Sequence, residues 1–233
     1  MIKESKLDKV KEVALLFLYQ EVEETEYSPV VVMHPIFESG FVTIMRDGKP
    51  EFINITESYE NLLLAQKECK KNIMTLDSIF SVYMIIRKSY RLTFLKFIKE
   101  YLSKKDMSEL LADAWISSEN PNNDVNVPSK TAVQWFREAD KRTLMTKDEY
   151  EYYQSLPQTV TAYRGVAEGG NPRGLSWTCN KKIAEWFANR FDKKGYVQSV
   201  TVDKSCVLAY FNSRDEDELV LDILSKNILI NII

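Results

Sequence analysis

The sequence predicts an α+β fold, on three observations. Apolar residues recur at helical spacing through most of residues 5–155. From residue 159 on, short apolar runs bounded by turn residues replace this pattern, as in strands. Five of the seven glycines lie between Gly165 and Gly195, which indicates tight turns or close backbone approach in the second part. Helices first and strands afterwards are typical of an α+β architecture.

The first 104 residues predict an accessory region made of a helix, a β-hairpin and two further helices. Apolar residues at helical spacing predict the first helix over residues 5–25, with Ser5 as its cap. The apolar run 29–33 predicts a short strand. Asp47 and Gly48, between two alternating runs, form the strongest short-range signal for a hairpin. We expect this region to take part in target recognition.

Residues 59–104 predict the two further helices of the accessory region, with a break near residues 75–77. The second helix carries basic residues that could line up as a stripe. These are Arg87, Lys88, Arg91, Lys96 and Lys99. Because core residues are interleaved with them at helical spacing, we expect a solvated face. If this stripe lay beside a pocket, it would favour nucleic acid as the substrate that the protein modifies.

Residues 105–157 predict the helical part of a second domain. Helices are expected over 106–116 and 129–140, joined by a polar, irregular connection. The run Thr146-Lys147-Asp148-Glu149 is a capping box, in which Thr and Glu satisfy backbone N–H groups at the start of a helix. We therefore expect a last helix to follow it.

The β-rich part, residues 158–233, completes this second domain, which is predicted to span 105–233. A single helix, 180–191 with Asn180 as its cap, interrupts the strands. The predicted strands are 159–164, 175–178, 196–202, 206–211, 218–223 and 227–232.

The composition argues against several classes of protein. Lys and Arg number 31 against 34 Asp and Glu, a net charge of −3, so we expect no large electrostatic footprint for nucleic acid. The net charge does not exclude a local basic groove. No apolar run reaches the roughly 18 residues of a membrane span, and the N-terminal segment predicts an amphipathic helix and not a signal peptide. We expect no membrane partner.

The numbers of cysteines and histidines argue against several kinds of site. The three cysteines, Cys69, Cys179 and Cys206, are widely spaced and fit a reducing cytoplasm without disulfides. The single histidine, His34, argues against a zinc cluster and leaves little basis for a Ser-His-Asp hydrolase. The glycine-rich signatures of P-loop and Rossmann sites are both absent. We expect no metal in the site.

Arg164 is the first residue of interest in the β-rich part. It ends an apolar strand and precedes Gly165. A guanidinium in this position can hold a phosphate with two hydrogen bonds while the backbone lies close to the ligand. An ordinary edge arginine is the alternative.

Two hydroxyl groups are the second feature. Alternation in Leu175-Ser176-Trp177-Thr178 places Ser176 and Thr178 on one face of a strand and the apolar side chains on the other. These hydroxyls can orient a carboxylate or a ribose by hydrogen bonding.

Paired carboxylates are the third feature. Glu216 and Glu218 lie two residues apart at the start of a strand, so we expect both on one face. Like charges so close raise the pKa of each other, which suggests a functional reason. An acidic loop entering a strand is the alternative.

The order of these features resembles that of a known family. The segments TAYRG, GLSWT, AEWFANRF and VLAYFNSRDEDELVLD resemble the mono-ADP-ribosyltransferases of the arginine-serine-glutamate class, particularly small bacterial and phage-encoded members. The clear resemblance covers residues 158–233, and a looser one covers residues 111–157. It implies a mixed β core of two packed small sheets, preceded by helices. Ser-Trp-Thr departs from the Ser-Thr-Ser of many members.

The resemblance implies roles for the site residues. Arg164 would bind the phosphates of NAD, the substrate, and the backbone of Gly165 would hold its carboxamide. Ser176 would position Glu218, and Thr178 would support the strand. Glu218 would be the catalytic carboxylate, and apolar residues after it favour this register in the acidic run.

Residues before Glu218 would recognise the target and activate its acceptor group. Glu216 would orient or deprotonate it. The turn that recognises the target would consist of Tyr210, Phe211, Asn212, Ser213 and Arg214.

The implied activity is transfer of ADP-ribose from NAD to a side chain of a target protein, with release of nicotinamide. In this family the Glu-x-Glu form implies arginine as the acceptor. The resemblance as a whole implies a toxin or a phage or bacterial effector that acts in the bacterial cytoplasm. Alternatives are modification of nucleic acid, hydrolysis of NAD, and a non-catalytic protein of the same fold that blocks a partner.

Overall fold

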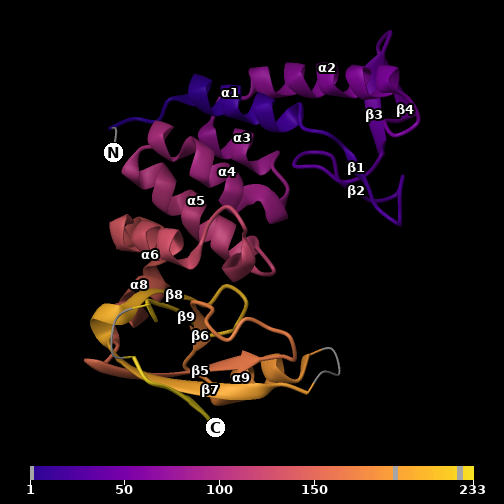
Figure 1. The fold of residues 1–233 in the computed structure, drawn as a ribbon. Coiled ribbons are helices and arrows are strands. Elements are labelled where there is room, and N and C mark those ends of the chain that lie inside the picture. The colour runs from indigo at the N-terminus through magenta and orange to yellow at the C-terminus, as the bar shows by residue number, and fades with distance from the viewer. Residues whose placement is uncertain (1–2, 191–193, 225–227) are drawn as a thin grey trace. The chain divides into compact units, whose positions relative to one another are not determined.

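The computed structural model describes residues 3–190, 194–224 and 228–233. The chain divides into two compact units, Met1–Asp106 and Met107–Ile233. The division lies close to the predicted boundary between residues 104 and 105. Helices and antiparallel sheets together confirm the α+β class (Figure 1). None of the helices in the described ranges has the length and apolar character that crossing a membrane requires.

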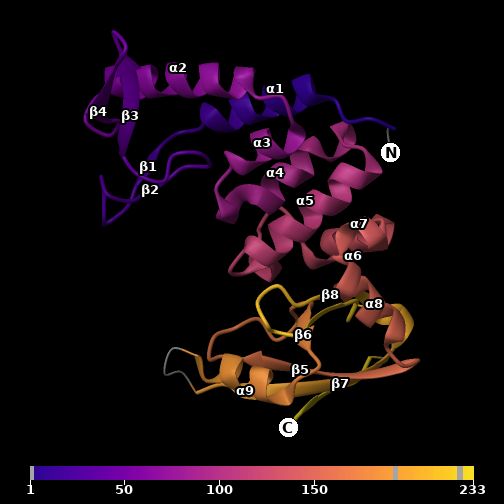
Figure 2. The same cartoon turned by 180° about the vertical axis from the view of Figure 1, so that it is seen from behind.

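The first unit contains helices around α1 and two small β-ribbons (Figure 2). Helix α1 packs against α2, α3 and α4 through residues that include the buried Val10, Ala14 and Phe17. The helices are α1 (Leu7–Leu18), α2 (Tyr59–Thr75), α3 (Ile79–Met84), η1 (Lys88–Tyr90), α4 (Arg91–Ile98) and η2 (Lys99–Tyr101). The strands are β1 (Glu23–Glu24), β2 (Val32–Met33), β3 (Phe41–Arg46) and β4 (Lys49–Asn54).

The hairpin prediction is confirmed. Strands β3 and β4 pair from Phe41–Asn54 to Arg46–Lys49, which leaves only Asp47 and Gly48 in the turn. Both have positive φ, 51° and 76°, as a two-residue hairpin turn of this hand requires.

The predicted first helix is too long. It ends at Leu18 because Glu23 and Glu24 form β1 and pair with β2. Ser5 is not its cap: the cap position is Lys6, without a side-chain hydrogen bond. The hydroxyl of Ser5 instead donates to the Asp106 carboxylate and accepts from the backbone N–H of Ser103 at 2.7 Å.

The expected solvated basic stripe is present only in part: Lys88 and Lys96 are exposed, whereas Arg87 and Arg91 are not. The segment consists of short helices, α3 to η2, so its side chains follow no single helical face. Arg87 turns inward, where its Nη1 donates to the carbonyl of Val32 at 2.8 Å. Arg91 is buried and its Nε donates to the carbonyl of Ile86 at 3.2 Å. Both guanidinium groups therefore hold backbone segments of the first unit together by hydrogen bonds to carbonyl groups.

The second unit consists of helices followed by a sheet. Its helices are α5 (Lys104–Ser117, which begins in the first unit), η3 (Pro121–Asn123), α6 (Ser129–Glu138), α7 (Lys141–Leu144), α8 (Lys147–Ser155), α9 (Lys181–Ala188) and η5 (Lys204–Cys206). The predicted capping box opens α8, and Asn180 caps α9, as expected. Residue 191, the predicted end of α9, lies outside the described residues.

The strands of the second unit form one six-stranded sheet, in the order β10-β7-β5-β6-β9-β8. They are β5 (Thr159–Val166), β6 (Ser176–Thr178), β7 (Tyr196–Asp203), β8 (Val207–Phe211), β9 (Glu218–Leu221) and β10 (Ile230–Ile232). Residue 227, at the start of the predicted last strand, is not described.

The strands therefore form one sheet and not the two packed small sheets that were expected. All pairings among the described strands are antiparallel, and one residue pair, Tyr163 with Thr178, joins β5 to β6. This junction links β10-β7-β5 to β6-β9-β8, which Figures 1 and 2 show as separate groups of strands. A site at the junction receives side chains from both groups.

Helix α9 lies directly against β5 at Gly165. A Cβ at this position would lie 2.0 Å from the carbonyl oxygen of Ala184 and 2.5 Å from the backbone nitrogen of Ala188. Both contacts are with backbone, which cannot move aside without shifting the helix. The glycine cluster thus marks close backbone approach, as predicted.

Gly165→Ala is expected to destabilise the protein by about 3 kcal/mol, because the added methyl group forces α9 away from β5. Urea denaturation measures this loss. Gly169→Ala is the control, since nothing lies within 4 Å of a Cβ there and only its positive φ of 75° opposes the change. An equal loss of stability in both variants would contradict the packing explanation.

Candidate active site

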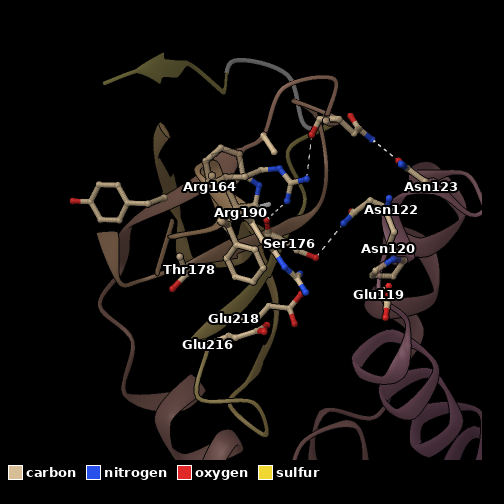
Figure 3. Close-up of a pocket in the computed structure, with 18 of the residues that line it drawn as sticks. Glu119, Asn120, Asn122, Asn123, Arg164, Ser176, Thr178, Arg190, Glu216 and Glu218 are labelled. Carbon is tan, nitrogen blue, oxygen red and sulfur yellow. Dashed lines mark hydrogen bonds between the residues drawn. The ribbon is translucent and has the colours of Figure 1, made fainter. Parts of the chain in front are cut away.

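A cavity of about 390 Å³ opens at the junction of the two strand groups, within the second unit. Its volume lies in the range of small-molecule sites. Figure 3 shows acidic, basic and amide side chains converging on it from opposite walls. Its lining includes Asn122, Arg164, Gly165, Ser176, Thr178, Arg214, Glu216 and Glu218.

Arg164 is partly buried in the wall of the cavity. Its Nη1 donates to the carbonyl of Ser176, and its Nη2 donates to the carbonyl of Asn171 at 3.1 Å, so the guanidinium holds the loop before β6. A Cβ on Gly174 would lie 2.3 Å from Nη2, which explains a glycine there. The Nε has no hydrogen-bond partner among the described residues. Burial lowers the pKa of Arg164 to about 10, opposed by Glu218, and the side chain stays protonated at neutral pH.

The hydroxyls of β6 lie at the cavity, as the alternation predicts. Ser176 Oγ accepts a hydrogen bond from Asn122 Nδ2 at 3.2 Å (Figure 3). Thr178 Oγ1 accepts from the backbone N–H of Asn180 at 3.0 Å and so ties the end of β6 to the start of α9. Trp177 is buried, and its Nε1 donates to the carbonyl of Gly174 at 3.0 Å.

Glu218 is the most buried acid of the cavity. It begins β9, pairs with Thr178 in the sheet and is 7% exposed. Its carboxylate accepts hydrogen bonds from Trp115 Nε1, at 3.0 Å, and from the side chain of Ser176.

Burial is the main cause of the raised pKa of Glu218. The hydrogen bonds from Ser176 and Trp115 and the charge of Arg214 oppose this rise. Glu216 contributes least, so the predicted repulsion between like charges is present but secondary. The site thus combines a desolvated carboxylate with donors that favour its ionised form.

Glu216 also lines the cavity, although it lies in the turn before β9 and not in the strand. Strand alternation therefore does not explain why it shares a side with Glu218. It precedes β9, and its neighbours Asp215 and Asp217 have left-handed φ of 55° and 46°. Its Oε2 lies 2.9 Å from Nη2 of Arg214. The same nitrogen lies 4.0 Å from Oε2 of Glu218.

The predicted recognition turn is wrong for its two aromatic members. Tyr210 and Phe211 are buried in β8, in contact with α6 and α8, and neither lines the cavity. Tyr210 donates from its hydroxyl to Asp217 at 2.8 Å. Asn212 is half-buried, and its backbone N–H donates to Glu149 at 2.8 Å. Arg214 lines the cavity.

Sequence reasoning missed Trp115. This residue of α5 packs in the core, where it contacts Phe136 edge to face with ring centroids 5.0 Å apart. It also donates to Glu218, 103 residues later in the chain. The only available signal was chemical: a buried indole N–H needs an acceptor.

Sequence reasoning also missed Asn122, which was placed in an irregular connection. Its Oδ1 accepts from the backbone N–H of Leu175 at 2.6 Å, and its Nδ2 donates to Ser176. One amide thus attaches the 119–123 wall to β6 and orients a hydroxyl next to Glu218. No pattern in the sequence indicated this contact.

Trp115→Phe is expected to lower, about tenfold at neutral pH, any activity that depends on the ionised Glu218 carboxylate, because one hydrogen bond to this buried charge is lost. Since the bond favours the ionised carboxylate, its loss raises the pKa of Glu218 further. The acidic limb of the pH profile should therefore move to higher pH, which a rate series across pH measures. Trp135→Phe, at another buried tryptophan, is the matched control. An unchanged limb would exclude this role for Trp115.

No protein-family model matches the sequence, and comparison with curated proteins and with solved structures found no match. Among the described residues, no group of three or more His, Cys, Asp or Glu side chains is arranged to hold a metal ion. The motifs and the geometry of the cavity are therefore the basis for a functional proposal.

Proposed function

We propose that the chain is an NAD-dependent mono-ADP-ribosyltransferase that modifies a protein side chain, with arginine as the first candidate. The observation that carries this proposal is the convergence of Arg164, Ser176 and Glu218, from three different strands, on one cavity that also contains Glu216. These are the residues on which the resemblance to the arginine-serine-glutamate class depends.

The side chains of the cavity fit NAD. Arg164 offers a partly buried cation at the cavity wall, and its positive charge suits a phosphate group. The backbone of Gly165 also lines the cavity, where it would meet the carboxamide. Ser176, held by Asn122, would keep Glu218 in place.

Electrostatics supports the catalytic roles. NAD, when bound, supplies an ADP-ribosyl group whose bond to nicotinamide breaks during the reaction. Glu218 would accept a hydrogen bond from the ribose and stabilise the positive charge that develops there. Its burial strengthens this interaction, since little water screens it. Glu216, less buried than Glu218, would remove a proton from the acceptor.

The experiment is to incubate the purified chain with NAD labelled in the adenylate part, with and without bacterial lysate, and to measure free nicotinamide and label on macromolecules. We expect release of nicotinamide and label on protein. Release without transfer would assign NAD hydrolysis, and label on nucleic acid would assign a different acceptor. If nothing is released, calorimetric titration with NAD separates a binding protein from a chain that does not recognise NAD.

A further inference from the structure

The residue between the two cavity glutamates is bound to a buried tyrosine outside the cavity. Glu216 and Glu218 line the cavity, whereas Asp217 does not. The Asp217 carboxylate accepts a hydrogen bond from the hydroxyl of Tyr210, on β8, at 2.8 Å. Tyr210 is 5% exposed and is also outside the cavity lining. A buried side chain therefore holds the residue that links the two acids.

The backbone conformation of Asp217 depends on such contacts. Its φ of 46° is left-handed, a region that residues with a side chain rarely adopt. Aspartate tolerates it because its short polar side chain can form hydrogen bonds nearby, as the Asp217 carboxylate does with Tyr210. A change of φ at Asp217 would rotate the preceding residue, Glu216, relative to Glu218, which follows.

The surroundings of this hydrogen bond are fixed on both sides. The backbone N–H of Asp217 donates to Oδ1 of Asn212 at 3.0 Å, and its carbonyl accepts from the backbone N–H of Cys179 at 3.3 Å. The ring of Tyr210 packs against that of Tyr152 on α8, with centroids 4.1 Å apart. Burial, together with the bond to Asp217, raises the pKa of Tyr210, so its hydroxyl keeps the proton that it donates.

We propose that Tyr210 is a positioning residue, which acts through Asp217 to keep Glu216 where it would meet the acceptor. This inference rests on the proposed function and deepens it, because it assigns a residue outside the cavity to the acceptor half of the reaction. A hydrogen bond that only stabilises the turn is the alternative that the experiment must exclude.

The two glutamates are held differently, which gives the proposal a specific consequence. Glu218 lies in β9 and accepts hydrogen bonds from Trp115 and Ser176. Glu216 lies in the turn, and its carboxylate contacts Arg214, whose side chain is 43% exposed. Loss of the Tyr210 hydroxyl should therefore displace Glu216 more than Glu218. Because misplaced catalytic groups lower the rate of the step they serve, transfer to an acceptor should fall more than hydrolysis of NAD.

The test compares Tyr210→Phe with the unchanged chain in the presence of NAD and agmatine, a small guanidinium compound that serves as the acceptor. Phenylalanine keeps the ring contact with Tyr152 and removes only the hydroxyl. We expect the ratio of agmatine modification to NAD hydrolysis to fall about tenfold, as for one lost hydrogen bond to a charged group, with the KM for NAD unchanged. If agmatine is not modified, the same ratio is measured on protein labelled in a bacterial lysate.

Tyr153→Phe is the matched control. The hydroxyl of Tyr153 also donates to β8, to the carbonyl of Val207 at 3.4 Å, but at the end of the strand far from the turn. This variant should keep the ratio of the unchanged chain. Circular dichroism confirms that each variant is folded.

Substitutions of Asp217 test the same contact from its other partner. Asp217→Asn should keep the ratio, because asparagine also tolerates left-handed φ and its side-chain oxygen can accept from Tyr210. Asp217→Ala should lower it, and adding Tyr210→Phe to Asp217→Ala should cause no further loss, since both changes remove one interaction. Asp217→Ala replaces Tyr210→Phe in the comparison if the latter does not fold.

Three results would overturn the positioning role of Tyr210. They are an unchanged ratio in Tyr210→Phe, an equal loss of transfer and hydrolysis, and additive losses in the double variant. Each leaves the proposed function intact, because the unchanged chain still modifies an acceptor. Hydrolysis without transfer to any acceptor, or no release of nicotinamide at all, would instead overturn the proposed transferase and this inference with it.

Discussion

Glu218→Gln is expected to reduce the rate of nicotinamide release by about 10²–10³-fold, the cost of removing one preorganised electrostatic group from a transition state. Glutamine has the same shape and keeps an oxygen for the Trp115 N–H, so the cavity should persist. The loss arises because a neutral amide cannot stabilise positive charge on the ribose.

Steady-state release of nicotinamide, with circular dichroism to confirm folding, measures this effect. Glu185→Gln on the exposed face of α9 is the control. An active Glu218→Gln variant would remove the basis for placing catalysis at this carboxylate, whatever the acceptor.

The same substitution should stabilise the fold at neutral pH. Burial raises the pKa of Glu218 in the folded state, so its contribution to stability is present below the unfolded pKa and is lost as pH rises through the folded pKa. Glutamine has no charge to bury. The stability gain should therefore appear at neutral pH and vanish in acid, a difference that the melting temperature of both proteins across pH would measure.

Arg164→Lys is expected to lower kcat/KM for NAD by about 10²-fold, the equivalent of losing one or two hydrogen bonds to a charged group. The guanidinium holds two carbonyls at once, those of Ser176 and Asn171, and a lysine ammonium cannot reproduce this planar fork. The loop before β6 would loosen, and the phosphates would lose their partner.

Two effects contribute to the loss, weaker binding of NAD and a looser loop before β6. Calorimetric titration with NAD measures the first, and a kinetic series measures their sum. We expect weaker binding of NAD as the larger component. Arg173→Lys, an exposed arginine of the same loop region, is the control. Unchanged affinity for NAD would argue against phosphate binding by Arg164 and assign it to loop architecture alone.

Local signals predicted features of both units. The hairpin turn at Asp47 in the first unit, and the capping box at Thr146 and the cap at Asn180 in the second, depend on hydrogen bonds and φ angles of near neighbours, and all three are present. The strand pattern also placed Ser176 and Thr178 at the cavity. These features follow from interactions a few residues apart, which a sequence shows directly.

Interactions between distant residues decided the rest. The Trp115 bond to Glu218 and the Asn122 bonds to β6 join segments that are 103 and more than 50 residues apart. The same holds for Arg87, which was expected on a solvated stripe and instead donates to the carbonyl of Val32, 55 residues earlier. No periodicity records such contacts, because they depend on which elements meet.

Residue types and their spacing are enough to predict the α+β class, the succession of strands along the chain and the side chains available for the site. Only the folded chain brings Arg164, Ser176 and Glu218 to one cavity, buries Tyr210 and pairs Glu216 with Arg214. Spacing along a chain fixes local geometry, whereas burial, charge pairing and pKa depend on neighbours from distant parts of the sequence.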